Sequence, residues 1–373
     1  MSELKVLLTN FRLAARTGTE LYVHDLALRL LERGHSPVVY SPLLGKLARE
    51  LRLSSVPVVD DPSAISTPPD VIHGQQRNET MLAMLHFPEA PAVYFCHDWY
   101  SPADSPPRFP RVLRYVAVDL TCRDKLTLEH AVPEERVRVV PSFVDLNLFK
   151  PRPPLPERPQ RALLFCNYAK TDERVRAVRA ACERAGLTLD VVGEGAGEVT
   201  ARPEELLGAY DLVFAKGRAA LEALAVGAAV IIYFGPRVGP LVTSGELDGL
   251  LQVNFGIRAL GPRLTPEALG QAVERELARY DAADAAAVSR RARETAGLEP
   301  AVDEIIKVYE EAVAELRAAG GPDFRAEERA AAEYIQLLHK EWSRDLTWRT
   351  RARIMRVPLL GRLARRLALI TDR

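Results

Sequence analysis

Residues 151–160 read PRPPLPERPQ, and this short stretch divides the chain into two halves that look alike. Its five prolines cannot continue a helix or a central strand, so the stretch is predicted to be a stiff linker. On both sides of it, short apolar runs alternate with helical stretches. A chain of 373 residues is long enough for two domains of this kind, with a single larger domain as the alternative.

The half before the linker contains apolar runs that are continuous rather than alternating with polar residues. Such runs are typical of strands covered on both faces, as in a parallel sheet. Helical stretches between them indicate right-handed crossovers and a doubly wound sheet. The predicted strands are residues 5–9, 37–40, 56–59, 71–73, 92–97, 115–118 and 137–140, and the first helix is residues 18–33.

The half after the linker repeats this pattern. Its predicted strands are residues 162–166, 189–192, 211–215 and 228–233, with helices at 172–185 and 218–226. We therefore expect an α/β protein with two tandem doubly wound, Rossmann-like domains, at residues 1–150 and 161–319, and a helical tail at 320–373. In open parallel sheets ligands bind at the carboxyl ends of the strands, so the crevice between the domains is the expected site.

Charge and composition exclude several classes of protein. Fifty Lys and Arg residues balance fifty Asp and Glu residues, which rules out the overall basic charge of a nucleic-acid-binding protein. The chain has no apolar run near 18 residues, and its start lacks the pattern of a signal peptide. The cysteines form no CxxC pair and no cluster has metal-ligand spacing, which favours free thiols, a cytoplasmic protein and no metal site. They are Cys96, Cys122, Cys166 and Cys182.

The stretch FAKGRAALEALAVG, residues 214–227, is the strongest candidate for a binding site. A strand leads into a loop that opens a helix, with Gly217 between the cations Lys216 and Arg218, followed by Ala219. A diphosphate at this helix start would meet the helix dipole, free amides and positive charge together. Glu222, one turn further on, is placed to accept hydrogen bonds from a ribose. The alternative is an ordinary helix start with solvated basic residues.

Two further loops carry candidate residues in the N-terminal half. In RLAARTGTE, residues 12–20, Gly18 would let the backbone approach a ligand, and Thr19 and Glu20 stand at a helix start; an ordinary helix cap is the alternative. In CHDW, residues 96–99, His97 and Asp98 end a strand and are candidates to bind a sugar hydroxyl or stabilise developing charge, with a structural histidine as the alternative. Hydride chemistry is disfavoured because the first turn lacks GxGxxG.

Five stretches of the sequence together resemble a known family. They are TGTELYVHDLALRLLERGHSPVVYSP (17–42), CHD (96–98), RVRVVPSFVDLNLFKP (136–151), VVGEG (191–195) and LEALAVGAAVI (221–231). In this order they resemble the GT-B glycosyltransferases, especially the large retaining group called family 4, over about residues 4–318. Within the third stretch, Val144, Asp145, Phe149 and Pro151 fit the inter-domain signature of that family.

The resemblance implies a function and a set of site residues. A nucleoside-diphosphate sugar would bind mainly to the second domain, with its diphosphate on the helix at Gly217 and its ribose on Glu222. Lys170, Gly193 and Glu194 would add to this donor site. The acceptor, a glycan or a lipid-linked molecule, would enter from the first domain near Gly18, Glu20 and His97. The resemblance further implies that protein cations replace a metal, and that the product is a cell-surface polysaccharide or glycoconjugate.

Two departures from the family pattern concern the donor site. The family has a second Glu eight residues before Glu222, where this chain has Phe214. The Arg and Lys that clamp the diphosphate after the first strand of the second domain are not cleanly present, and the candidate substitutes are Lys170 or Arg174, or else Lys216 and Arg218. Two other functions therefore stay open, a GT-B-shaped binding or scaffold protein without turnover and a sugar-nucleotide epimerase of GT-B shape.

The C-terminal tail is basic and amphipathic. Residues 349–366 read RTRARIMRVPLLGRLARR, with seven Arg and no acid, and Pro358 is expected to divide the segment into two short helices. Its apolar partners are Trp342, Trp348, Ile354, Leu359, Leu360, Leu363 and Leu367. This composition is typical of a segment that binds a membrane surface, here the inner face of the membrane. The alternatives are a helix packed on the first domain and a tail that binds a partner protein.

Overall fold

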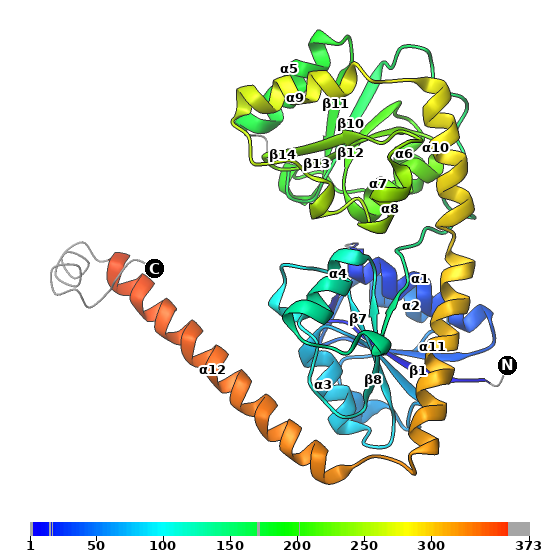
Figure 1. The fold of residues 1–373 in the computed structure, drawn as a ribbon, viewed down its shortest axis with the longest axis vertical. Helices are drawn as coiled ribbons and strands as arrows, with labels where there is room; N and C mark the ends of the chain where they lie inside the picture. The colour runs from blue at the N-terminus through cyan, green and yellow to red at the C-terminus, as the bar shows by residue number, and fades with distance from the viewer. Residues whose placement is uncertain (1–2, 15, 17, 170–171, 201, 357–373) are drawn as a thin grey trace.

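The computed structural model describes residues 3–14, 16, 18–169, 172–200 and 202–356, with side chains through residue 344. Two α/β domains lie one above the other, and the chain passes between them twice (Figure 1). The first passage is the segment that leads into the proline-rich linker. The second is the junction of α10 (Ala282–Thr295) and α11 (Leu298–Ala318). The predicted pair of tandem Rossmann-like domains is thus confirmed.

The N-terminal domain is built on a seven-stranded sheet whose strands are all parallel. In spatial order the strands are β5 (Val58–Val59), β3 (Ser36–Tyr40), β1 (Lys5–Thr9), β6 (Val71–Gln75), β7 (Ala92–Cys96), β8 (Val112–Ala117) and β9 (Val137–Val139). Strands β1, β6 and β7 are buried along nearly their whole length, as expected for strands with helices on both faces.

Helices and short turns connect these strands. They are α1 (Gly18–Glu32), α2 (Lys46–Leu53), η1 (Pro62–Ala64), α3 (Arg77–His86), η2 (Pro102–Asp104), α4 (Leu120–Asp124), η3 (Lys125–Glu129) and η4 (Glu134–Arg136), with a small two-stranded sheet of β2 (Arg12–Leu13) and β4 (Leu43–Leu44). Helix α1 buries Val23, Leu26 and Leu30, spaced three and four residues apart, against the sheet.

The C-terminal domain has a five-stranded sheet. Its spatial order is β11 (Thr188–Val192), β10 (Arg161–Phe165), β12 (Leu212–Ala215), β13 (Ala229–Phe234) and β14 (Arg237–Leu241), and β14 alone of these strands is antiparallel. The connections are α5 (Glu173–Arg184), η5 (Glu194–Ala196), α6 (Pro203–Leu207), α7 (Gly217–Val226), α8 (Leu247–Gln252), η6 (Ile257–Ala259) and α9 (Pro266–Leu277).

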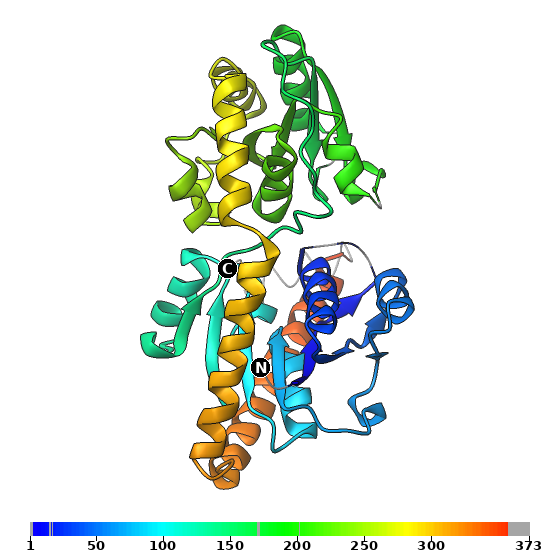
Figure 2. The ribbon, with the colours of Figure 1, turned by 90° about the vertical axis from the view of Figure 1, so that its right-hand side faces the viewer.

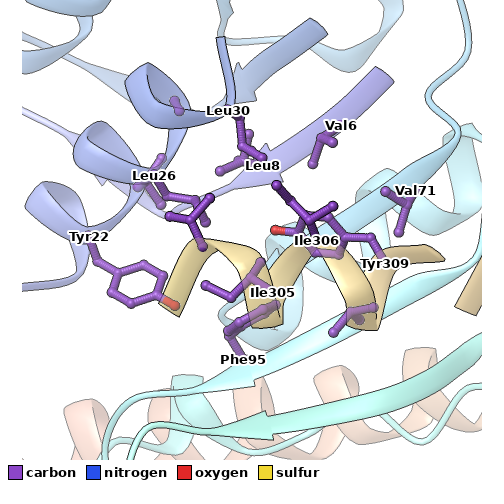
Figure 3. Packing of buried hydrophobic residues seen from close by; sticks show 14 of the residues in the cluster. Val6, Leu8, Tyr22, Leu26, Leu30, Val71, Phe95, Ile305, Ile306 and Tyr309 are labelled. Atoms are coloured by element: carbon purple, nitrogen blue, oxygen red, sulfur yellow. The ribbon is translucent and has the colours of Figure 1, made fainter. Parts of the chain in front are cut away.

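Helix α11 belongs to the N-terminal domain, which corrects the expected boundary at residue 319. Figure 2 shows α10 and α11 running in line from one domain down to the other. Ile305, Ile306 and Tyr309 of α11 are fully buried among residues such as Leu26 of α1 (Figure 3). The apolar residues of α11 recur at helical spacing in the sequence, but the spacing does not identify the surface that they pack against, and the expected boundary followed the order of the chain.

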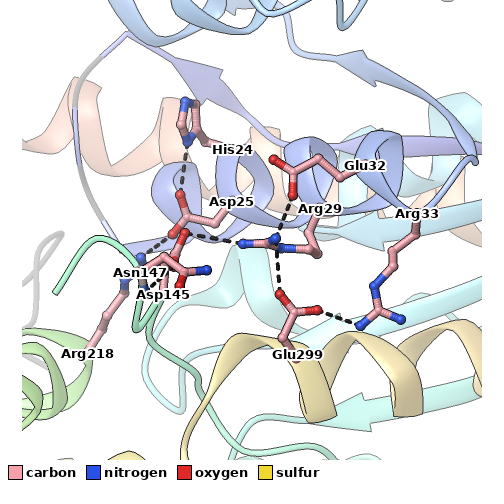
Figure 4. A network of polar contacts seen from close by, with 9 residues as sticks. All are labelled: His24, Asp25, Arg29, Glu32, Arg33, Asp145, Asn147, Arg218 and Glu299. Carbon is pink, nitrogen blue, oxygen red and sulfur yellow. Dashed lines mark hydrogen bonds and ion pairs between the residues drawn. The ribbon is translucent and has the colours of Figure 1, made fainter. Parts of the chain in front are cut away.

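The two passages between the domains are joined at one point. The backbone N–H of Val144 donates to the carbonyl of Ala296, and the N–H of Leu298 donates to the carbonyl of Val144, at 2.9 and 3.1 Å. Close by, Arg29 of α1 forms ion pairs with Asp145 (3.4 Å) and with Glu299 (3.0 Å) (Figure 4). The two passages are therefore joined to each other by backbone hydrogen bonds and to helix α1 by ion pairs.

The tail begins as a single long helix, α12 (Phe324–Arg356), which leaves the foot of the N-terminal domain (Figure 1). Pro358 lies outside the described residues. In the part of the chain that the structure describes, no helix combines the length and the apolar character needed to cross a bilayer.

Candidate active site

Each sheet reverses its winding direction at one place, and these two places face each other across the domain boundary. In the N-terminal sheet the reversal lies between β1 and β6, and in the C-terminal sheet it lies between β10 and β12. The carboxyl ends of strands at such a reversal splay apart and leave a crevice. The loops after β1, β10 and β12 are therefore the expected walls of a site.

A cavity of about 120 Å³ lies there, between the domains. It is lined by Arg16, Gly18 and Leu21 of the N-terminal domain and by Phe165, Cys166, Asn167, Val192, Gly193, Val199, Thr200, Pro203, Arg218, Ala219 and Glu222 of the C-terminal domain. Five of the residues predicted from the sequence are among them, namely Gly18, Gly193, Arg218, Ala219 and Glu222. The structure thus brings the two predicted loops to one cavity.

The start of helix α7 forms one wall of this cavity. Lys216 is the N-cap residue and its side chain makes no cap hydrogen bond. Gly217 has a φ of 58°, in the left-handed region that favours glycine, and its N–H donates to the carbonyl of Phe255 at 3.1 Å. Arg218 and Ala219 follow. Their amides belong to the first turn, which lacks intrahelical acceptors, so they are available to a ligand in the cavity.

The side chain of Arg218 is held by two carboxylates from different domains. It forms an ion pair with Glu222, one turn along α7, at 2.7 Å, and another with Asp25 of helix α1. Asp25 in turn accepts a hydrogen bond from His24 at 2.9 Å (Figure 4). Arg218 and Asp25 are each only 13% exposed, and one atom of the guanidinium, Nη1, is buried without a partner among the described residues.

Burial and charge act in opposite directions on these carboxylates. Burial alone would raise the pKa of Asp25, but Arg218 and His24 together lower it. For Glu222, burial outweighs the effect of Arg218, and its pKa is raised. Asp25 is thus the more firmly ionised partner of the guanidinium, because it has a second hydrogen-bond donor.

Gly193 is needed for a close approach of two backbone segments. A Cβ atom on Gly193 would lie 2.1 Å from the carbonyl oxygen of Cys166, at the ends of the neighbouring strands β11 and β10. Glu194, the next residue, is exposed and does not line the cavity. The VVGEG stretch therefore shapes the floor of the cavity with its backbone.

Several other predicted residues lie beside the cavity lining rather than in it. Lys216 places its ammonium 4.5 Å from the ring centre of Phe234, and Thr19 is half-buried. Glu20 is fully buried and forms an ion pair with Arg12 at 3.1 Å. Lys170 lies outside the described residues. Arg174, its alternative, is paired with Asp172 at the start of α5.

His97 and Asp98 also lie outside the cavity lining. The ring of His97 stands edge-on to that of Tyr22, with centroids 4.6 Å apart, and burial lowers the pKa of His97 to about 3. The carboxylate of Asp98 is exposed and accepts a hydrogen bond from the N–H of Tyr100 at 3.0 Å. His97 is thus a neutral imidazole, and the carboxylate of Asp98 stabilises a turn.

A polar cluster, of which the sequence analysis identified only His97, lies at the carboxyl ends of β1, β6 and β7. Its members are Asn10, Tyr22, Gln75 and His97. Each has one buried polar atom without a partner among the described residues, namely Oδ1, the hydroxyl, Oε1 and Nε2. Buried polar groups rarely stay unpaired, so the polar cluster is suited to bind hydroxyl groups.

The spacing of residues along helix α1 could have identified two functional residues, Tyr22 and Asp25, that the sequence analysis did not name. Tyr22 and Asp25 follow Gly18 at four and seven residues, on the face of α1 that the glycine opens. No group of three or more His, Cys, Asp or Glu residues suited to a metal ion occurs in the described ranges.

Comparisons with known proteins agree with this geometry. Residues 16–148 match the model of Glycosyltransferase Family 4. The sequence matches none of the curated proteins.

Solved structures with a similar fold include HepE of Anabaena in complex with UDP and glucose. It is 15% identical, covers 83% of this chain and 100% of its own, and has a TM-score of 0.62. A glycosyltransferase of Rickettsia africae is 15% identical, covers 84% and 99% of the two chains, and has a TM-score of 0.59. Sucrose-phosphate synthase of Thermosynechococcus elongatus is 15% identical, covers 84% and 100%, and has a TM-score of 0.53.

The fold and the position of the cavity define a protein of the GT-B class. Within that class, residues 16–148 match the family 4 model, in agreement with the resemblance stated from the sequence.

Proposed function

We propose that this protein is a glycosyltransferase that binds a nucleoside-diphosphate sugar between its domains and transfers the sugar to a glycan or a lipid-linked acceptor. One observation carries the proposal. The cavity lies where both sheets reverse their winding, and it brings together the start of α7, Arg218 and Glu222. The neighbouring structure of HepE, which has the same fold, contains UDP and glucose.

The C-terminal wall suits the donor. When the bond to the sugar breaks, negative charge grows on the diphosphate leaving group. The amides of Arg218 and Ala219, the dipole of α7 and the guanidinium of Arg218 are fixed in place to stabilise that charge, and we propose that they do so without a metal ion. Glu222 is positioned to accept hydrogen bonds from the ribose.

We place the acceptor on the N-terminal side of the cleft, beside the cavity rather than in its lining. There the polar cluster would offer donors and acceptors to hydroxyl groups of a sugar. With a pKa of about 3, His97 is too weak a base to remove a proton efficiently near pH 7, so its role is to orient a hydroxyl through Nε2. Asp98 holds a turn and Glu20 is paired with Arg12, so we propose positional roles at the cleft for these two candidates as well.

The acceptor and location follow from the fold class and the tail. We propose that the product is a cell-surface polysaccharide or glycoconjugate, made at the cytoplasmic face of a membrane. Two alternatives have less support. A scaffold without turnover is favoured by Phe214, a fully buried strand residue at the position of the second Glu. An epimerase requires acid and base side chains in the cavity, and of the described residues that line it only Glu222 is a carboxylate.

The proposal is tested by calorimetric titration with UDP, GDP, ADP and dTDP, followed by an assay of slow hydrolysis of the matching nucleotide sugar. We expect one diphosphate to bind and its sugar nucleotide to be hydrolysed, because water replaces the absent acceptor. Binding without hydrolysis or transfer would support the scaffold. No binding of any of the four would refute the proposed donor site.

A further inference from the structure

The loop that follows β1 is held against helix α2 at three points. Its strand β2 pairs with β4, which directly precedes α2. Gly45, between β4 and α2, permits a close approach, because a Cβ atom there would lie 2.5 Å from the Cα of Ala14. Further along the loop, Nη1 of Arg16 lies 2.7 Å from Oε2 of Glu50 on α2. Since the apolar face of α2 is buried in the N-terminal core, the guanidinium of Arg16 is positioned by the fold of that domain.

Arg16 and Arg218 line the same cavity from different domains. Of the described residues that line it, these two are the only cations, and Glu222 is the only carboxylate. The other described cations considered for this site, Lys216 and Arg174, are not among the lining residues. The cavity therefore has one guanidinium on each wall.

Each of these two guanidiniums has one buried N–H group without a partner among the described residues. The atom is Nε in Arg16 and Nη1 in Arg218. Carboxylates hold the other side of each group, namely Glu50 for Arg16, and Asp25 (Figure 4) and Glu222 for Arg218. Buried N–H groups rarely stay unpaired. Because guanidinium nitrogens only donate hydrogen bonds, a ligand that pairs with both must present acceptor oxygens.

The polar cluster of the N-terminal domain has the opposite character. The unpaired atoms of Asn10 and Gln75 are carbonyl oxygens, which accept hydrogen bonds, and none of the four members of the cluster is a Lys or an Arg. Neutral hydroxyl groups suit such a cluster. The cavity, with two unpaired donors on two cations, instead suits a ligand that carries negative charge on several oxygens, as phosphates do.

We propose that Arg16 and Arg218 hold one diphosphate group between them, with each guanidinium on a different phosphate. The inference rests on the proposed function, in which this diphosphate is the leaving group of the sugar donor. Two phosphates suit the site better than one, because the two cations belong to opposite walls and are anchored to different helices. Glu50 anchors Arg16 to α2, and Glu222 anchors Arg218 to α7.

A diphosphate held in this way would link the two domains. In the structure, the ion pair of Arg218 with Asp25 makes such a link. The ligand would take the place of Asp25 on Arg218, while Arg16 would supply the contact from the N-terminal domain. The cleft would then close on the donor, and the charge that grows on the leaving group would meet a fixed cation from each side.

The test is calorimetric titration of the full-length protein with inorganic pyrophosphate and, separately, with inorganic phosphate, in a buffer free of divalent cations. We expect the wild type to bind pyrophosphate at least tenfold more tightly than phosphate. Arg16→Gln should weaken pyrophosphate binding about tenfold, through the loss of one charged hydrogen-bond donor. It should leave phosphate binding nearly unchanged, because the start of α7 and Arg218 remain. Arg16→Lys, which restores the charge, should recover part of the loss.

Arg114→Gln is the matched control. Arg114 also belongs to the N-terminal domain and is paired with a carboxylate, that of Glu315. Its side chain is 19% exposed, against 22% for Arg16. Because Arg114 does not line the cavity, this variant should bind pyrophosphate as the wild type does. Circular dichroism establishes that the variants are folded.

Three outcomes would overturn the inference. They are a wild type that binds pyrophosphate no more tightly than phosphate, an unchanged affinity for pyrophosphate in Arg16→Gln, and an equal loss in Arg114→Gln. The nucleoside diphosphates separate this inference from the proposed function. If one of them binds the wild type and Arg16→Gln equally, the donor site stands and the role of Arg16 is refuted. If pyrophosphate binding depends on Arg16 but no nucleoside diphosphate binds, the proposed function alone fails.

Discussion

Arg218 of α7 and Asp25 of α1 form an ion pair across the two domains, although 193 residues separate them in the sequence. The same guanidinium lines the cavity in which we place the donor diphosphate. The cavity, at about 120 Å³, is smaller than the roughly 300–1,000 Å³ of typical small-molecule pockets. A nucleotide sugar thus requires the domains to separate, and this ion pair is a direct link that opposes separation.

The first prediction concerns Asp25→Asn, which removes the negative charge that faces Arg218. We expect the domains to separate more readily, which small-angle X-ray scattering would record as a larger radius of gyration. The free energy of unfolding should fall by about 1–3 kcal/mol, because Arg218 keeps Glu222 as a partner. Asp303→Asn is the control. Asp303 is paired with Arg33 but 58% exposed, and the same substitution there should have little effect on either measurement.

The second prediction concerns Glu222→Gln. The substitution replaces one of the two oxygens proposed to accept from the ribose hydroxyls with an NH2 group and removes the charge, so affinity for the preferred nucleoside diphosphate should fall by about 1–3 kcal/mol in calorimetric titration. Glu205→Gln, on the neighbouring helix α6 and 57% exposed, serves as the control. If Glu222→Gln binds the nucleotide as tightly as the wild type does, the ribose lies elsewhere.

The third prediction is a pH dependence at Asp104. Burial, and then the charge of Asp98, raise the pKa of Asp104 to about 7. A carboxyl whose pKa is higher in the folded state lowers stability as pH rises from its unfolded pKa to its folded pKa. The stability of Asp104→Asn relative to the wild type should therefore increase by roughly 4 kcal/mol between about pH 4 and pH 7 and stay constant above that range. Urea unfolding of both proteins at several pH values measures it. A difference that is constant with pH would show that folding does not raise the pKa of Asp104.

The fourth prediction separates two glycines of the C-terminal domain. Gly193→Ala should lower the free energy of unfolding by about 3 kcal/mol, because the new Cβ would lie 2.1 Å from the carbonyl oxygen of Cys166. Gly208→Ala should be close to neutral, because no atom lies within 4 Å of a Cβ there and its φ is −64°. Equal stability of the two variants in urea unfolding would mean that the strand ends can move apart.

The fold could be predicted from the sequence because the strands are continuous apolar runs, a local feature. Strand β14 was not predicted, since it is an antiparallel edge strand with a Gly and a Pro in its five residues. The assignment of α11 to the C-terminal domain was wrong for a different reason, because an apolar stripe can pack on any apolar surface. The local sequence pattern does not identify the neighbours of β14 or of α11.

The part of the candidate site that is formed by one loop and the start of one helix could be predicted from the sequence. The part that depends on side chains from distant segments could not. Gly217 and Arg218 were recognised because a loop that opens a helix attracts anions. Asp25 was not recognised, because its importance arises only when α1 and α7 approach each other. The rest of the polar cluster, beyond His97, was missed for a similar reason, since the loops after β1, β6 and β7 are brought together by sheet order.

A crystal structure of the protein with its preferred nucleoside diphosphate tests the central claim most directly. We predict diphosphate density at the amides of Arg218 and Ala219, a ribose against Glu222, and Arg218 released from Asp25. A nucleotide bound away from the start of α7, or the Arg218–Asp25 pair intact beside a bound diphosphate elsewhere, would contradict it.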